Sequence, residues 1–362
     1  MLKKLLFIGC ILSLLFSCKD KAGYQIKIDL SNLEAQNLYA IFEASDRKSV
    51  DTLFCDGSSA IIITQVQEDF RTLTVYFEKQ AQWISVYLEP QKTITITGDI
   101  RNPLSYQIKG GKINNQLSEF RKKIAPLLKQ QTSLIASENS NEQHKEKEDN
   151  TSRLANISHE IRGEAESFIK KHPSEEASAI LIRDFFSDPD MPGQIDQLLD
   201  ELDPELDDFY IVKDLRAYSE KAKQTMIGAK VPAFNVRNIY GKIFSEKSYT
   251  SRPFIIAFTA LWCDMCQTEE LLLDEIAATY PEDSLGILLV SLDENPKEVR
   301  ELIKNDSIKW NIVTDSAGQA IKMLDLFNIK AIPRSFLINK DGDIILKTEN
   351  GNELKQALSE SI

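Results

Sequence analysis

The chain has 362 residues, of which 42% are hydrophobic and 27% are charged, and its formal net charge is −12. A chain of this length is expected to hold two or three domains, and this balance of residues is typical of globular proteins with buried cores. The negative charge argues against nucleic acid as a partner, because nucleic-acid binding needs basic patches that contact the phosphates.

The first residues predict an export signal. Lys3 and Lys4 precede the apolar run Leu5–Phe16, which is shorter than the about 20 helical residues that span a bilayer and fits the hydrophobic region of a signal peptide. The following LFSC resembles a bacterial lipobox, which implies that residues 1–17 are removed and that Cys18 is lipidated. We therefore expect an exported, periplasmic or outer-membrane lipoprotein of a Gram-negative bacterium. The alternative is an ordinary signal peptide with an incidental cysteine.

Residues 18–110 are predicted to form an antiparallel β-sandwich. Runs such as YQIKIDL, RTLTVYFE and TITITGDI alternate apolar and polar residues with a period of two, as half-buried strands do. Turn signals such as Asp56-Gly57 separate them, and six or more short strands imply two packed sheets. The segment YLEPQKTITITGD, followed by YQIKGGKINNQLSEF, is similar to the uncharacterised β-domain that precedes many thioredoxin-like lipoproteins.

Residues 111–225 are predicted to be α-helical, because apolar residues recur there at helical spacing. Residues 138–153 are almost wholly polar and form either a solvated connection between helices or a long charged helix end. The three histidines of the chain, His144, His159 and His172, lie in or beside charged stretches of this region. We expect them on the surface rather than in a catalytic site.

Residues 226–362 are predicted to form an α/β sheet with helices on both faces. PFIIAFTA is a continuous apolar run, as expected for a strand covered on both sides. Apolar strand patterns then alternate with helical patterns, and the chain closes with the hairpin RSFLIN-KDG-DIILKT and a last helix. This alternation is the signature of an α/β domain.

Cys263 and Cys266 lie where a strand pattern changes into a helical one. The first turn of a helix has free N–H groups and a partial positive charge, which stabilise a thiolate. The CxxC spacing also allows the second sulfur to reach the first. Such a pair can attack a substrate disulfide and then release itself by forming an internal one.

A zinc site and a structural disulfide are the alternatives to a reactive cysteine pair. A zinc site needs four ligands, and apart from Cys18 the mature chain has only Cys55 as a further cysteine, with no histidine after Cys263. A purely structural disulfide is the second alternative. Cys55, in TLFCDG, is predicted to be a small buried thiol. We expect no metal and no cofactor.

Three motifs in residues 226–362 carry a resemblance to thioredoxin-like proteins of the TlpA/ResA-like branch. ALWCDMC resembles their W-C-x-x-C motif, KAIPRSFLI their cis-proline loop, and IGAKVPAFNVRNIYGKIF their lead-in and extra hairpin. The resemblance implies that Cys263 is the nucleophile, that Cys266 resolves the mixed disulfide, and that the two form a disulfide. It also implies that Trp262 shields the site and shapes the docking surface.

The resemblance assigns further residues. A cis Pro333 after Ile332 would leave neighbouring backbone groups free to pair with a substrate strand. Glu269 matches the acidic residue that these proteins place near the buried thiol, where it could take the proton of Cys266 during resolution. Its alternative is an ordinary acid of the first helical turn. The adjacent Glu270 is a second acid that could be confused with it.

Departures from the family pattern bear on the direction of the reaction. The cysteines enclose Asp264-Met265 without the usual proline, and an acid there disfavours the thiolate that a strong oxidant needs. Ile332 matches reducing members better than the threonine of isomerases. Thr259 lies four residues before Cys263 rather than three as in peroxiredoxins, which argues against a peroxidase.

These features predict a thiol-disulfide oxidoreductase that reduces disulfides of periplasmic partner proteins. Its electrons would come from a membrane-embedded thiol donor, and cell redox homeostasis, including cytochrome c maturation, is the role that the resemblance implies. An oxidase or isomerase of the same fold is one alternative. A binding lipoprotein with a vestigial thioredoxin domain, attached to the membrane by its lipid, is the other.

Overall fold

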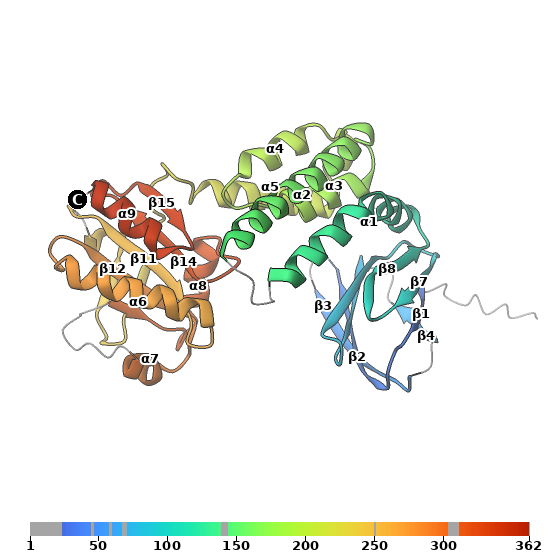
Figure 1. Ribbon diagram of the computed structural model, residues 1–362, viewed down its shortest axis with the longest axis horizontal. Helices are drawn as coiled ribbons and strands as arrows, with labels where there is room; N and C mark the ends of the chain where they lie inside the picture. Colours follow the sequence, from blue (N-terminus) through green and yellow to red (C-terminus); the bar gives the residue numbers. More distant parts are fainter. Residues whose placement is uncertain are drawn as a thin grey trace, which may run out of the picture. The chain divides into compact units, whose positions relative to one another are not determined.

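The computed structural model describes residues 24–44, 47–57, 60–66, 71–138, 144–249, 251–302 and 311–361. The predicted signal peptide and Cys18 lie outside the described residues. Among the described helices, none combines the length and the hydropathy that crossing a membrane requires. Contacts between residues divide the chain into two compact units, Met1–Phe168 and Ile169–Ile362 (Figure 1).

A β-sandwich opens the first unit. Within the described residues it has two four-stranded sheets with the orders β4-β1-β7-β8 and β3-β2-β5-β6. The strands are β1 (Tyr24–Ser31), β2 (Gln36–Glu43), β3 (Lys48–Cys55), β4 (Ala60–Val66), β5 (Thr72–Phe77), β6 (Gln82–Tyr87), β7 (Thr93–Asp99) and β8 (Asn102–Lys109). The predicted sandwich is confirmed, but one pair is not antiparallel, because β1 and β7 run parallel.

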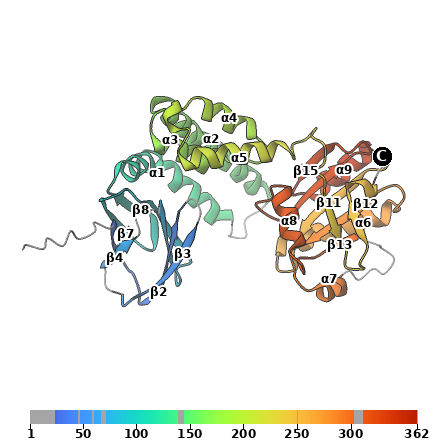
Figure 2. The ribbon, with the colours of Figure 1, turned by 180° about the vertical axis from the view of Figure 1, so that it is seen from behind.

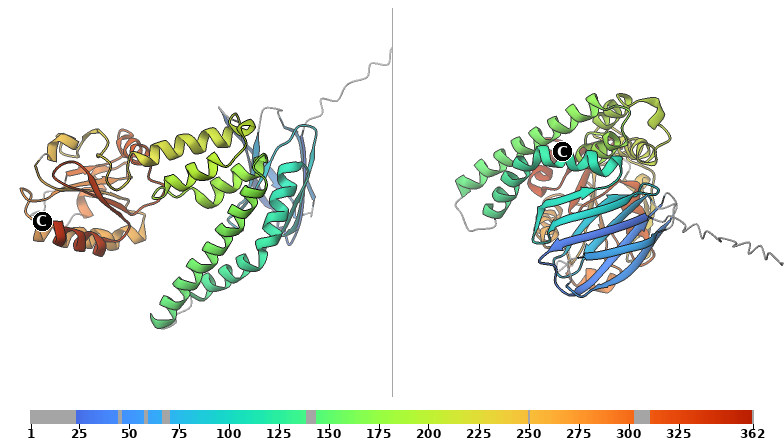
Figure 3. Two further views of the ribbon diagram at one scale, coloured as in Figure 1. Left: turned by 90° about the horizontal axis from the view of Figure 1, so that it is seen from above. Right: turned by 90° about the vertical axis from the view of Figure 1, so that its right-hand side faces the viewer.

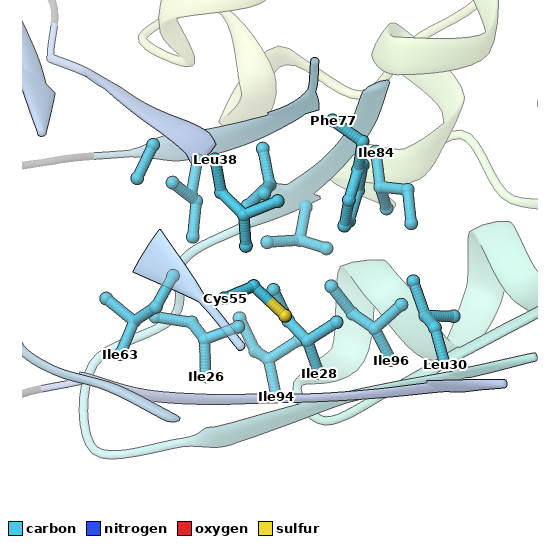
Figure 4. Packing of buried hydrophobic residues seen from close by; sticks show 14 of the residues in the cluster. Ile26, Ile28, Leu30, Leu38, Cys55, Ile63, Phe77, Ile84, Ile94 and Ile96 are labelled. Atoms are coloured by element: carbon cyan, nitrogen blue, oxygen red, sulfur yellow. The ribbon is translucent and has the colours of Figure 1, made fainter. Parts of the chain in front are cut away.

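The period-two pattern builds the core of the sandwich. Strand β2 buries Leu38, Ala40 and Phe42, while the residues between them face outward. Figure 4 shows apolar side chains from the two sheets meeting in one layer, with Cys55 among them. Removal of this apolar surface from water stabilises the sandwich by about 25 cal/mol per Å². Cys55 lies in this apolar layer and is buried, as the sequence predicts.

Two long helices, α1 (Lys112–Glu138) and α2 (His144–Lys171), follow the sandwich. Figure 3 shows them side by side, and the Phe120 and Phe168 rings meet edge to face with centroids 6.0 Å apart. The charged stretch after residue 143 is thus a helix end rather than a loop. His159 is exposed, as expected.

Three helices of the second unit, α3 to α5, pack on one another before the α/β sheet begins. Their bounds and those of a short 3-10 helix are α3 (Glu176–Phe186), α4 (Pro192–Asp200), η1 (Pro204–Leu206) and α5 (Tyr210–Lys223). His172, in the turn before α3, is exposed.

The α/β part has a sheet of order β13-β12-β11-β14-β15 and a small β9–β10 hairpin. Strands β11 to β13 are parallel, and β14 and β15 are antiparallel to their neighbours. The elements are β9 (Asn235–Arg237), β10 (Ile243–Ser245), η2 (Glu246–Tyr249), β11 (Phe254–Thr259), α6 (Asp264–Thr279), β12 (Gly286–Ser291), α7 (Pro296–Leu302), β13 (Asn311–Val313), α8 (Gln319–Leu326), β14 (Arg334–Ile338), β15 (Ile344–Thr348) and α9 (Gly351–Ser361).

Strand β11 lies at the centre of this sheet and is buried along its whole length. Ile255 and Ala257 contact the apolar cluster that includes residues of α6 and α9. Ile256 and Phe258 face the opposite cluster, which includes residues of α8. The helices therefore cover both faces of the sheet (Figure 2), and the predicted α/β sheet with helices on both faces is confirmed.

Candidate active site

The two cysteines of the CxxC motif lie where β11 passes into α6. Cys263 is the N-cap residue of α6, and its Sγ accepts a hydrogen bond from the backbone N–H of Cys266 at 3.2 Å. The structure joins the two sulfurs in a disulfide. Cys263 is half-buried, whereas Cys266 is 0% exposed. The pair thus has one sulfur that a partner can reach and one that it cannot.

The cap geometry has a chemical consequence. N-cap side chains normally accept hydrogen bonds from N–H groups of the first helical turn, and here a sulfur takes that place. A hydrogen bond from an N–H and the positive end of the helix both favour a thiolate over a thiol. When the disulfide opens, the half-buried Cys263 is the sulfur with this stabilisation.

The loop that precedes β14 borders the sulfur pair. The peptide bond between Ile332 and Pro333 is cis, and the carbonyl oxygen of Ile332 lies 3.9 Å from Cys263 Sγ. Pro333 is buried, whereas Trp262, next to the cysteine, is 68% exposed. Met265 is equally exposed. The Cys263 sulfur therefore lies beside the backbone of the cis-proline loop, and exposed apolar side chains stand close to it in the sequence.

Glu269, the acid predicted to serve Cys266, has a different contact. Its Oε2 accepts a hydrogen bond from the backbone N–H of Gly351 at the start of α9. A carboxylate at the N-terminus of a helix stabilises that helix. The observed contact of Glu269 therefore links α6 to α9 and does not involve a sulfur atom.

Glu270 is the acid whose setting resembles that of a proton acceptor. It lies one helical turn after Cys266, and residues four apart share a helix face. Its Oε1 accepts a hydrogen bond from the Thr259 hydroxyl at 2.7 Å. Burial raises the pKa of Glu270; this hydrogen bond opposes the shift, and the charges of Asp274 and Asp293 add to it. Thr259 thus contacts Glu270.

Asp293 supports the segment that carries the motif. Its Oδ2 accepts hydrogen bonds from the backbone N–H of Leu261 at 2.9 Å and from the Ser291 hydroxyl at 2.6 Å. Leu261 directly precedes Trp262, so the bond fixes the turn between β11 and the cysteines. Asp293 was not predicted from the sequence. Its signal was available, because Asp293 follows the strand that pairs in parallel with β11, and such strands end at one edge of a sheet.

A five-stranded sheet with helices on both faces, a CxxC motif at a helix N-terminus and a neighbouring cis-proline define a thioredoxin-fold redox protein. The AhpC/TSA family model matches residues 227–347.

Two sequence relatives agree with this class. Thiol-disulfide oxidoreductase ResA of Bacillus cereus is 28% identical over 145 residues, which are 40% of this chain and 82% of that protein. Sporulation thiol-disulfide oxidoreductase A of Bacillus subtilis is 31% identical over 134 residues, which are 36% of this chain and 78% of that protein. A solved thiol-disulfide oxidoreductase from Bacteroides fragilis has 25% identity, covering 37% of this chain and 99% of its own, with a TM-score of 0.33. The chain belongs to the family of thiol-disulfide oxidoreductases that includes these Bacillus proteins, as the resemblance predicted.

Proposed function

We propose that this protein reduces disulfide bonds of partner proteins by dithiol–disulfide exchange through Cys263 and Cys266. The observation that carries the proposal is the position of Cys263 Sγ. It is half-buried, it accepts an N–H of the first helical turn, and it lies 3.9 Å from the Ile332 carbonyl oxygen. A sulfur in this place is reachable, favoured as thiolate and next to backbone that can hold a partner.

The reaction proceeds in two exchanges. The Cys263 thiolate attacks one sulfur of the partner disulfide; a mixed disulfide forms and the second partner sulfur leaves as a thiolate that takes up a proton. Cys266, deprotonated, then attacks Cys263 Sγ, and the first partner sulfur leaves in the same way. The partner gains two electrons and two protons, and the protein ends in the disulfide form that the structure contains. A thiol donor must then reduce it for the next cycle.

The neighbouring residues take supporting parts in this proposal. Backbone groups at Ile332 and Pro333 pair with an extended partner segment, and Trp262 provides an apolar surface beside the sulfur. We assign the proton of Cys266 to Glu270 rather than Glu269, because the raised pKa of Glu270 suits a proton acceptor and its helix position matches that of Cys266.

Insulin reduction tests the proposal. The reduced protein is expected to precipitate insulin B chains, and Cys263→Ser is expected to abolish this activity. Cys55→Ala is the matched control, because it removes a sulfur that is buried in the sandwich, and it should retain full activity. Unchanged activity in the Cys263→Ser variant would refute the proposed chemistry.

We further propose that the protein acts outside the cytoplasm as a lipoprotein, with electrons from a membrane thiol donor. The lipobox-like LFSC and the preceding apolar run support this placement. The full chain, produced in a Gram-negative host, should incorporate labelled palmitate and partition into a detergent phase. Cys18→Ala should do neither. Absence of label in the unaltered chain would contradict the lipid anchor.

A further inference from the structure

The residue that follows the cis-proline is held by two carboxylates. Arg334 begins β14 directly after Pro333, and its side chain is 12% exposed. Its Nη2 donates to both carboxylate oxygens of Asp190, at 2.8 and 2.6 Å, and its Nη1 donates to Glu349 Oε1 at 3.1 Å. Contacts of a guanidinium with both oxygens of a carboxylate fix orientation as well as distance.

Asp190 belongs to the connection between α3 and α4, far from Arg334 in the sequence. The same carboxylate also pairs with Lys347 of β15, whose side chain is 5% exposed and whose Nζ lies 2.6 Å from Asp190 Oδ1. Burial opposes ionisation of Asp190, but the hydrogen bonds and charges of Lys347 and Arg334 outweigh it and lower its pKa. At neutral pH one charged carboxylate therefore links the helical connection to β14 and β15.

A hollow of about 200 Å³ lies at this junction. Pro189 of the α3–α4 connection forms part of its wall, together with Ile329, Lys330 and Ala331 of the segment that leads to Pro333. Arg334 lines the same hollow. The α3–α4 connection thus borders the cis-proline loop both before and after the proline.

We propose that Asp190 is a positioning residue for partner recognition. Through Arg334 it holds the loop at Pro333. Together with Pro189, it makes the α3–α4 connection part of the surface that binds an extended segment of the partner polypeptide next to the partner's disulfide. The proposal rests on the proposed function. It assigns to this helical connection the selection of protein disulfides over disulfides of low molecular weight.

The reason lies in what each kind of substrate touches. A polypeptide that pairs with the backbone at Ile332 continues past the cysteine sulfur and depends on the position of the whole loop. A small disulfide such as glutathione disulfide exchanges with Cys263 and offers little chain for this pairing. A displaced loop should therefore slow the reaction with a protein and leave the reaction with glutathione disulfide unchanged.

A second ionic contact offers a matched control. Lys221 of α5 pairs with Asp325 of α8, so it also links the helices to the α/β part, but at residues outside the cis-proline loop. If Asp190 only fastened the helices to the sheet, loss of either contact would have the same effect. The Asp325→Asn variant separates a general fastening from a local positioning role.

The test measures the rate constants with which the reduced protein reduces insulin and glutathione disulfide, and compares the two. Asp190→Asn should lower the rate constant for insulin about tenfold, the equivalent of one or two lost hydrogen bonds, and should leave that for glutathione disulfide within about twofold. Asp325→Asn should change neither. Because Asp190→Asn leaves the buried Lys347 without its carboxylate, the double variant Asp190→Asn/Lys347→Met is measured as well, and it should keep the insulin defect.

Four results would overturn the proposal: no change in Asp190→Asn, an equal loss with both disulfides, an equal insulin defect in Asp325→Asn, or full recovery of insulin reduction in the double variant. Failure of the proposed function itself looks different, because the unaltered protein would then reduce neither disulfide.

Discussion

The β-sandwich and the α/β part each enclose a cysteine that is almost completely buried, yet the two sulfurs have different surroundings. Cys55 is 2% exposed and Cys266 is 0% exposed. Cys55 Sγ accepts the Gly57 N–H at 3.4 Å, much as Cys263 Sγ accepts the N–H of Cys266 at 3.2 Å. Burial and a hydrogen bond from a backbone N–H therefore do not by themselves predict a redox-active sulfur. Access for a partner, a helix N-terminus and a second sulfur within reach do.

The largest expected effect comes from breaking the pair while keeping its reachable member. Cys266→Ser leaves Cys263 able to attack but removes the resolving thiol, so turnover should fall by about a thousandfold or more. The variant should accumulate a mixed disulfide with its partner, visible as a band on a non-reducing gel. The double variant Cys263→Ser/Cys266→Ser should show no such band. A mixed disulfide between the partner and Cys55 would contradict the proposed difference between Cys55 and the CxxC cysteines.

A second difference should appear in thiol reactivity. In the reduced, folded protein at pH 7, Cys263 should react with iodoacetamide about 100 times faster than Cys55, because its thiolate is stabilised and reachable. Peptide mass spectrometry after timed alkylation measures both rates in one sample. In denaturant the two rates should converge. Similar rates in the folded state would mean that the helix end and the exposure of Cys263 confer no advantage.

A third effect concerns Glu270, the acid that we propose accepts the proton of Cys266. Glu270→Gln should slow resolution of the mixed disulfide about tenfold at neutral pH and remove the decline in rate that accompanies protonation of Glu270 in acid. Glu269→Gln is the matched neighbour and should retain that decline, because its carboxylate contacts α9. Rates of partner release between pH 4 and pH 8 measure this. If Glu269→Gln alone removed the decline, the assignment to Glu270 would be wrong.

The raised pKa of Glu270 also predicts the sign of a stability change. Since the folded state binds this proton more tightly than the unfolded state, whose carboxyl has a pKa near 4.5, folding gains stability at low pH and loses it as the pH rises through the raised pKa. Glu270→Gln should therefore flatten the dependence of the free energy of unfolding on pH between the unfolded pKa near 4.5 and the raised pKa of the folded state. A steeper dependence in the variant would contradict the burial of this carboxyl.

The smallest effect is expected in the sandwich. Cys55→Ala removes one buried sulfur and should lower the free energy of unfolding by about 1 kcal/mol, measured by urea denaturation, without changing insulin reduction. A loss of reductase activity in this variant would show that Cys55, like Cys266, is required for the reaction, and would contradict the comparison of the two buried sulfurs.

Much of the fold could be predicted from local patterns. Alternation with a period of two identified the strands of the sandwich, and the continuous run around Ile255 identified a strand covered on both faces. The parallel pairing of β1 and β7 could not be predicted, because a strand pattern carries no information on the direction of a neighbour more than 60 residues away.

The residues of the site also fall into those that could be predicted from the sequence and those that could not. Cys263, Cys266 and the proline motif are contiguous sequence features, so they were recognisable. Glu269 and Glu270 are adjacent, and on a helix adjacent side chains point about 100° apart, so only the packing of α6 reveals which one meets Thr259. Asp190 and Arg334 are 144 residues apart, and their contact requires the folded chain.

The measurement that tests the account most directly is the reduction potential of the Cys263–Cys266 couple, determined by equilibration with glutathione and quantified by thiol alkylation. The account predicts a potential of about −270 mV, as for thioredoxin, because a protein that donates electrons to partner disulfides must hold its own disulfide more stably than theirs. A potential of about −120 mV would identify a disulfide-forming oxidant and contradict the account.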